Sequence, residues 1–140
     1  MNMDEIINNL FVGDISDTII FREYRDERQM KVYIIDVTDY GSNPYANCNV
    51  PIFNMEDPEV SVETADIHQL DKIADLIEMK LIEGYKVLVH CGAGMERSPT
   101  AIIYYLYKYQ NMTIDQAYGF VREKHHNMFD RRNWLSKVGR

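Results

Sequence analysis

The chain has 140 residues, of which 46% are hydrophobic and 26% charged, and this composition excludes intrinsic disorder. The longest apolar run, residues 101–107, is far shorter than the ~18 residues that a membrane-spanning helix needs, and residues 1–5 lack the pattern of a secretory signal. The net charge of −7 disfavours nucleic acid, because the phosphate backbone repels an acidic protein. We therefore expect one cytoplasmic domain spanning residues 1–140, a monomer that binds neither membranes nor nucleic acid.

The first half of the chain predicts short strands separated by turns. Residues 10–12, followed by Gly13, and the β-branched run at residues 32–37 are typical of strands. Residues 50–53 predict a further strand. It should lie near an edge of the sheet, because Pro51 has no N–H to donate to a neighbouring strand.

The second half of the chain predicts helices alternating with one more strand. Apolar residues repeat at helical spacing from residue 63 to 83, and residues 86–89 predict a short strand that leads to Cys91. Residues 99–110 predict a helix that is apolar nearly all round and hence central, and a capping box at Thr113 predicts another helix after it. The fold class is therefore α/β, with a mixed, mostly parallel sheet of four to five strands flanked by helices.

A glycine-bearing loop connects the strand before Cys91 to the central helix that follows Arg97. Amide N–H groups at a helix N-terminus lack intrahelical partners and attract anions, and Gly92 and Gly94 permit the tight curvature that such a loop requires. The planar guanidinium of Arg97 matches two phosphate oxygens at once, and the positive surroundings favour the reactive thiolate form of Cys91. A small buried cysteine and an ordinary helix-start cation are the alternative interpretation, which this combination disfavours.

The run His90-Cys91-Gly92-Ala93-Gly94-Met95-Glu96-Arg97-Ser98 resembles the signature loop of the protein tyrosine phosphatase superfamily, His-Cys-x-x-Gly-x-x-Arg-Ser/Thr. Its continuation, Ser98-Pro99-Thr100, is most similar to dual-specificity phosphatases, and weaker similarities at residues 6–13, 32–38 and 115–129 cover nearly the whole chain. The resemblance implies a phosphatase-type phosphate-binding loop that needs neither a metal nor another cofactor. The phosphate would be held by the loop residues Cys91, Gly92, Ala93, Gly94, Met95, Glu96 and Arg97.

The resemblance also implies a general acid on a loop some thirty residues before the cysteine. Asp57 lies at that distance and follows a predicted strand, so we assign it this role, with Glu56 and Asp66 as competitors. A simple turn residue before Pro58 is the alternative interpretation of Asp57. By the same resemblance, Ser98 would hydrogen-bond the cysteine sulfur and help it to leave in the second step.

The implied activity is hydrolysis of phosphotyrosine, and of phosphoserine and phosphothreonine, on protein substrates through a cysteinyl-phosphate intermediate. The loop carries no Lys and one acid, and residues 54–83 hold nine acidic residues against two Lys, which disfavours polyanionic substrates such as phosphoinositides or RNA ends. A phosphate-binding adaptor that has lost catalysis is the alternative. A rhodanese-like or arsenate-reducing enzyme is a weaker one, since those proteins normally lack this combination of upstream Asp and Ser-Pro-Thr.

Other features of the sequence have simpler interpretations. The only other cysteine, Cys48, is either a small packed residue or a thiol able to form a protective disulfide with oxidised Cys91. The adjacent His125 and His126 do not predict a metal site, because neighbouring residues on a helix point in different directions. His90 is expected to orient the loop rather than act as a base. Residues 122–140 carry a charge of +4, which is typical of a solvated helix face or of a docking patch for an acidic partner.

Overall fold

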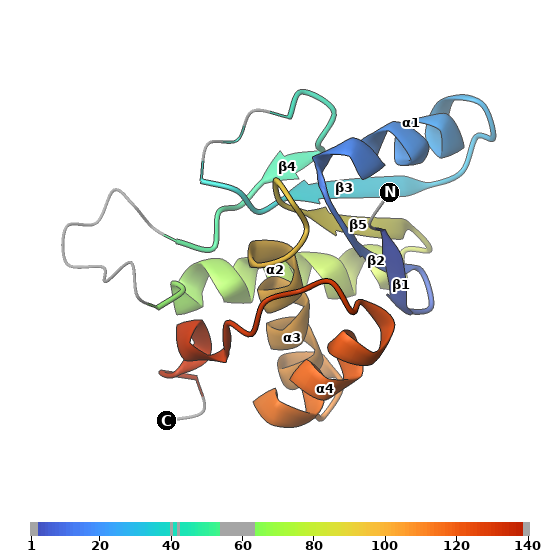
Figure 1. Ribbon diagram of the computed structural model, residues 1–140. Helices are drawn as coiled ribbons and strands as arrows, with labels where there is room; N and C mark the ends of the chain where they lie inside the picture. The colour runs from blue at the N-terminus through green and yellow to red at the C-terminus, as the bar shows by residue number, and fades with distance from the viewer. Residues whose placement is uncertain (1–2, 40, 42, 54–63, 139–140) are drawn as a thin grey trace.

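The computed structural model describes residues 3–39, 41, 43–53 and 64–138, which form one sheet with helices on both faces (Figure 1). The strands are β1 (Asp4–Ile7), β2 (Leu10–Gly13), β3 (Val32–Asp36), β4 (Cys48–Asn49) and β5 (Lys86–His90). The helices are α1 (Thr18–Asp26), α2 (Ile67–Ile82), α3 (Arg97–Tyr109) and α4 (Ile114–Lys124), with 3-10 turns η1 (Ile15–Asp17) and η2 (Arg132–Leu135). None of these helices is long and apolar enough to span a membrane.

The five strands are arranged in the order β1-β2-β5-β3-β4. β1 pairs antiparallel with β2, whereas all other neighbours are parallel, which confirms the predicted mixed, mostly parallel sheet. β5 lies at the centre, with Val89 opposite Val12 of β2 on one side and Ile35 of β3 on the other. The strand that leads to Cys91 is therefore the best-supported strand of the sheet.

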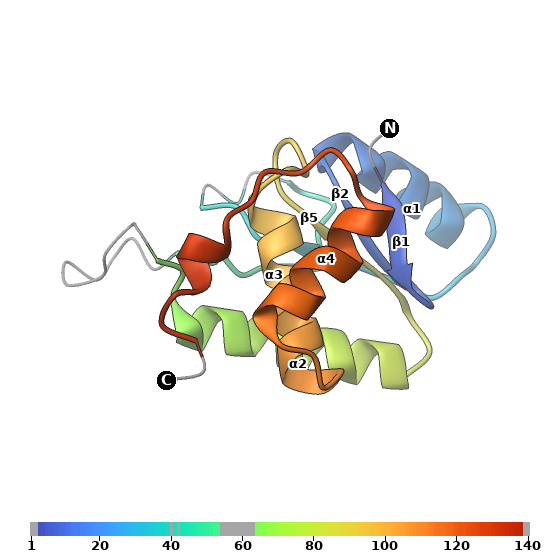
Figure 2. The same cartoon turned by 60° about the horizontal axis from the view of Figure 1, so that its bottom comes forward.

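Alternate residues of the sheet face two different helical layers (Figures 1 and 2). On one face, Ile34 and Leu88 pack with Phe21 of α1 in a small buried cluster. On the other face, Val87 and Val89 belong to the large core that the sheet shares with α2, α3 and α4. This period of two is the expected signature of strands that are buried on both sides.

α3 is the central helix, as its apolar sequence predicts. It contacts α2 and α4 on either side as well as β2 and β5, and every residue from 98 to 106 is buried. The capping box predicted for α4 is also present, because Thr113 Oγ1 accepts from the Gln116 N–H (3.1 Å) and Gln116 Oε1 accepts from the Thr113 N–H (2.9 Å).

Two sequence predictions need correction. The predicted strand at residues 50–53 is wrong, because the short β4 ends at Asn49 and residues 50–53 belong to no strand. Pro51 has no N–H to donate, and the carbonyls of Pro51 and Ile52 accept instead from Gln69 Nε2 (3.0 Å) and the Asp66 N–H (2.7 Å) at the start of α2. The predicted helix at residues 63–83 begins later, at Ile67, where the Asp66 side chain accepts from the Gln69 N–H.

Candidate active site

Cys91 lies at the carboxyl edge of the parallel strands, where ligands bind in open α/β sheets. The strands on both sides of β5 support it there. The N–H of Val37, just after β3, donates to the His90 carbonyl (3.0 Å), and Ser98 Oγ at the start of α3 donates to the Gly13 carbonyl at the end of β2 (3.2 Å). The sheet and α3 thus hold both ends of the loop in place.

The loop is fastened from outside through its main-chain carbonyls. Three of them accept hydrogen bonds from other elements: Gly92 O from Ile15 N (3.2 Å), Gly94 O from His125 Nε2 (2.7 Å) and Met95 O from Phe129 N (2.9 Å). In a trans peptide the carbonyl and the N–H of the following residue point in opposite directions. The amide N–H groups of residues 93, 95 and 96 are therefore directed toward the inside of the loop.

Gly94 occupies a position that only glycine fits. Its φ is +73°, which side chains rarely adopt, and a Cβ added there would lie 2.9 Å from the main-chain carbonyl of Gly13. Its N–H donates to the Cys91 sulfur (3.2 Å). The curvature attributed to this glycine is therefore what brings its amide to the Cys91 sulfur.

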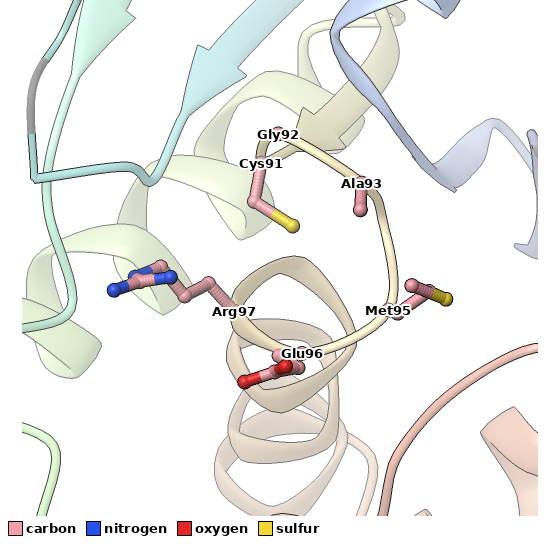
Figure 3. A pocket seen from close by; sticks show the side chains of 6 residues that line it. All are labelled: Cys91, Gly92, Ala93, Met95, Glu96 and Arg97. Carbon is pink, nitrogen blue, oxygen red and sulfur yellow. The ribbon is translucent and has the colours of Figure 1, made fainter.

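The sulfur of Cys91 faces the interior of the loop (Figure 3). The residue is only 4% exposed, but it lines a cavity of about 180 Å³ together with Gly92, Ala93, Met95, Glu96 and Arg97. That volume is more than ten times the roughly 10–15 Å³ that one water requires, so a tetrahedral oxyanion has room. Ser98 Oγ lies 3.3 Å from the sulfur, within hydrogen-bond reach. The structure therefore brings the predicted loop residues and Ser98 together.

The guanidinium of Arg97 lies across the open side of the loop (Figure 3). Its Nη2 donates to Asp39 Oδ2 (3.0 Å), and its carbon lies 5.5 Å from the centre of the Phe53 ring. Its Nε is buried and has no hydrogen-bond partner within the described part of the chain. Because buried N–H groups are nearly always paired, this orphaned donor indicates that a ligand oxygen belongs beside it.

Asp39 is a site residue that the sequence interpretation missed. It follows β3 and reaches Arg97 across a sequence separation of 58 residues. No local pattern distinguishes it from other acidic residues in turns. Its position after a central parallel strand was the one available signal, because the carboxyl ends of such strands meet at one edge.

Glu96 points away from the sulfur (Figure 3). Arg131 Nε contacts its carboxylate at 3.3 Å. Its negative charge is thus offset before it meets a bound phosphate. Of the basic residues from position 122 on, Arg122 and Lys124 are exposed on the last turn of α4, whereas Arg131, Arg132 and Lys137 lie beyond its end, so they do not share one helix face. Arg132, for example, pairs with Asp115 and Asp130 of the same chain.

His90 is neutral and fully buried beneath the loop. The Asn43 side-chain oxygen accepts from the Tyr45 N–H (2.9 Å), which fixes the amide so that its nitrogen donates to His90 Nε2 (2.9 Å). The other ring nitrogen, Nδ1, then carries the proton and faces the Cys91 carbonyl (3.2 Å). Burial accordingly lowers the pKa of His90. His90 therefore orients the main chain beside Cys91, as expected.

We expect the neutral state of His90 to make the fold less stable in mild acid. The imidazole of the unfolded chain takes up a proton near pH 6.5, whereas the lowered pKa of His90 keeps the folded ring neutral. The free energy of unfolding should therefore fall as the pH drops below about 6.5, by up to about 1.4 kcal/mol per pH unit from this residue. NMR of the ring protons checks this, with the exposed His68 and His126 as internal references; a His90 signal that titrates at or above pH 6.5 would contradict it.

The candidate general acids fall in a different part of the chain. Asp57 and Glu56 lie outside the described residues. The third candidate, Asp66, caps α2, where its carboxylate accepts from the Gln69 N–H at 3.1 Å. Capping gives Asp66 a structural role at the helix N-terminus.

A disulfide between Cys48 and Cys91 does not fit the sheet. Cys48 pairs with Ile35 of β3, and Ile35 pairs with Val89 of β5, so two strand spacings of about 4.8 Å separate the cysteines laterally. Cys91 lies two residues beyond Val89, just past the end of β5. Disulfides need Cα atoms within about 7 Å, so the protective-disulfide alternative is wrong for this fold. Burial raises the pKa of the Cys48 thiol.

A cavity that holds a tetrahedral oxyanion in front of a cysteine sulfur is the defining arrangement of the protein tyrosine phosphatase superfamily. A family model described as "Dual specificity phosphatase, catalytic domain" matches residues 15–138. The chain is 31% identical over 139 residues to a protein of Invertebrate iridescent virus 6 named "Putative tyrosine phosphatase 123R", covering 99% of this chain and 90% of that protein.

Two further comparisons extend the likeness. Over 69 residues the chain is 42% identical to human dual specificity protein phosphatase 16. This alignment covers 49% of this chain and 10% of the human protein. The crystal structure of human DUSP28 superposes with a TM-score of 0.76 at 18% identity, covering 98% of this chain and 90% of that one. The chain belongs to the dual specificity phosphatase family and is a cysteine-dependent protein phosphatase.

Proposed function

We propose that this protein hydrolyses phosphotyrosine and phosphoserine/phosphothreonine monoesters on proteins, with Cys91 as nucleophile and Arg97 as phosphate holder. The observation that carries the proposal is the cavity that Cys91 and Arg97 line together with the loop residues whose amides are directed inward. These donors would hold the three equatorial oxygens of the phosphoryl group during in-line attack by sulfur.

Both steps of the reaction take place at the sulfur of Cys91. Attack on phosphorus forms an S–P bond and breaks the P–O bond to the substrate, whose oxygen takes a proton from Asp57. Water then attacks the cysteinyl phosphate with Asp57 as base, so that phosphate leaves and the sulfur is released as thiolate. Ser98 Oγ, 3.3 Å from the sulfur, would stabilise that thiolate by turning its single O–H from the Gly13 carbonyl to the sulfur.

A protein substrate fits the surroundings of the loop better than a polyanion. The loop offers no Lys, and the nearby Arg131 is engaged by Glu96. The names of the relatives, tyrosine phosphatase and dual specificity protein phosphatase, support phosphoproteins as substrates. The adaptor alternative is disfavoured because nucleophile and arginine are both in place.

Hydrolysis of para-nitrophenyl phosphate and of phosphopeptides tests the proposal. We expect turnover that survives EDTA, is blocked by vanadate, and extends to phosphotyrosine and phosphothreonine peptides of the same sequence. Vanadate binding without any turnover would favour the adaptor. Turnover that EDTA abolishes would exclude the cysteine mechanism.

Replacing the proposed general acid should slow catalysis without weakening phosphate capture. Asp57→Ala removes the proton donor for the leaving oxygen, so we expect kcat to fall about 10²- to 10⁴-fold while the inhibition constant of vanadate changes little. The loss should shrink for leaving groups of lower pKa, which need less protonation.

Asp66→Asn is the matched control, because it changes a carboxylate that caps α2. It should alter the free energy of unfolding by no more than about 1 kcal/mol and leave kcat within a few-fold. If Asp66→Asn showed the large loss and Asp57→Ala did not, the assignment of the acid would be reversed.

A further inference from the structure

The phosphate-binding loop makes one unusual contact with a buried histidine. His125, the residue that follows α4, is 1% exposed, and its Nε2 lies 2.7 Å from the main-chain carbonyl of Gly94. Its Nδ1 lies 2.6 Å from a carboxylate oxygen of Asp4 in β1. The contact spans 31 residues to the loop and 121 residues to Asp4, so it joins three distant parts of the chain.

Both partners of the ring are acceptors. A main-chain carbonyl can only accept a hydrogen bond, and so can an ionised carboxylate. A neutral imidazole carries one proton and can satisfy only one of them, whereas an imidazolium donates to both. With Asp4 ionised, only the charged ring donates to both partners, in contrast to the neutral His90 on the other side of the loop.

The surroundings of His125 support that charge. Asp4 supplies the negative partner, and its side chain is 44% exposed, so it keeps its own hydration. The neighbouring cation, Lys124, directs its ammonium to the Ile6 carbonyl (3.0 Å). On the loop side, the ring faces Gly94, whose N–H donates to the Cys91 sulfur. Asp4 is thus the charged side chain that contacts the ring, Lys124 precedes it in the chain, and Cys91 lies beyond Gly94.

The Gly94 carbonyl is the point through which the ring acts on the phosphate site. Holding this carbonyl outward turns the N–H of Met95, in the same peptide, toward the cavity. If His125 lost a proton, the remaining one would stay on Nδ1 facing the Asp4 carboxylate. The Nε2 lone pair would then face the Gly94 carbonyl, and two acceptors repel at that distance.

We propose that His125, held as an imidazolium by Asp4, is a positioning residue that aims the Gly94–Met95 peptide at the substrate phosphate. The inference rests on the proposed function of the Cys91 loop. It makes phosphate capture dependent on the protonation of a residue that never touches the substrate.

The first test reads the ring directly. In a ¹⁵N–¹H spectrum of the substrate-free protein at pH 7, both ring nitrogens of His125 should carry protons, whereas Asp4→Asn should leave the ring with one. A ring that is neutral at pH 7 in the unmodified protein overturns the proposal. This measurement needs no turnover, so it stands even if the proposed enzymatic function fails.

The second test reads the site. His125→Gln and Asp4→Asn should each weaken vanadate inhibition and lower kcat/KM for para-nitrophenyl phosphate by about 10- to 100-fold, the range expected when a reacting group is slightly misplaced. Asp4→Asn in the His125→Gln background should add nothing further. The exposed neighbour His126→Gln is the matched control and should leave both quantities unchanged.

The outcomes separate this inference from the proposed function. If the unmodified protein is active and both variants bind vanadate and turn over as it does, the positioning role is wrong and the function stands. If the unmodified protein neither binds vanadate nor hydrolyses phosphate, the proposed function is wrong. If His125→Gln fails to fold, Asp4→Asn decides the question, because it changes a partly exposed side chain. Its vanadate inhibition and its kcat/KM are then compared with those of the unmodified protein.

Discussion

Cys91→Ser should abolish hydrolysis while leaving phosphate binding in place. A serine hydroxyl is almost entirely protonated at neutral pH, so replacing sulfur by oxygen removes the thiolate on which the covalent step depends. The groups that we propose to hold the phosphate stay, namely the inward-directed amides and Arg97. We expect kcat for para-nitrophenyl phosphate to fall below detection, at least about 10⁵-fold, with vanadate or inorganic phosphate still bound.

Cys48→Ser is the matched control, since it makes the same chemical change at the other cysteine. Cys48 lies in β4, two strands away from β5, and burial raises the pKa of its thiol, which makes it a poor nucleophile at neutral pH. The variant should keep full activity. Alkylation by iodoacetamide should label Cys91 first and be slowed by phosphate. Activity that survives Cys91→Ser would overturn the nucleophile assignment.

The part of the site that could be predicted from sequence is the part built from consecutive residues. Cys91, Gly94, Arg97 and Ser98 occur in one short segment, so their spacing alone places them in one loop. The capping box at Thr113 was predictable for the same reason, because its two hydrogen bonds join residues three positions apart.

The part that could not be predicted depends on contacts between distant residues. Asp39 and His125 reach the loop across 58 and 31 residues, and Asp4 reaches His125 across 121. Each is a polar residue at the end of a strand or helix, where polar residues are common. The topology of the sheet, which sets what lies beside the end of β5, decides which of them face the loop.

The wrong strand at residues 50–53 has a different cause. Its residues have β-type side chains, but propensity describes a fit to a pleated surface rather than a pairing partner. The N–H of Val50 still donates to the Asp36 carbonyl (2.8 Å), so the chain begins to pair with β3. Pro51 then interrupts the ladder, and the carbonyls of Pro51 and Ile52 accept hydrogen bonds from the start of α2. The sequence interpretation correctly noted that Pro51 cannot donate to a neighbouring strand. The missing N–H does more than place the segment near an edge, because it ends the pairing altogether.

Arg97→Lys should lower kcat/KM by at least about 10³-fold, although it preserves the positive charge. The phosphoryl group that is being transferred is best held by two parallel donors. The guanidinium can supply them from Nε and a terminal nitrogen, whereas the ammonium of Lys acts as a point charge. Removing a single preorganised donor typically costs about 10²- to 10³-fold, and here the pair is lost. Both kcat and vanadate binding should suffer, since the contact exists before and during the reaction.

The fold itself should tolerate this change. The ion pair of Arg97 with Asp39 is partly exposed on both sides, with side chains 33% and 26% accessible, and such pairs contribute about 0.2–1 kcal/mol. A urea titration of Arg97→Lys should therefore stay within about 1 kcal/mol of the unmodified protein. A loss of activity without a loss of stability would locate the effect in the phosphate contact.

Arg131→Lys provides the comparison that isolates geometry from charge. Arg131 also lies beside the loop, but it contacts the Glu96 carboxylate on the outer side, with its side chain 38% exposed. The same substitution there should change kcat/KM by less than about tenfold, because a rim ion pair contributes little and Lys can replace it. Equal losses in the two variants would mean that the general positive potential around Cys91, rather than the fork of Arg97, binds the phosphate. The unpartnered Arg97 Nε predicts the opposite, because a buried donor without a partner costs about 1–3 kcal/mol, which a substrate oxygen beside it would recover.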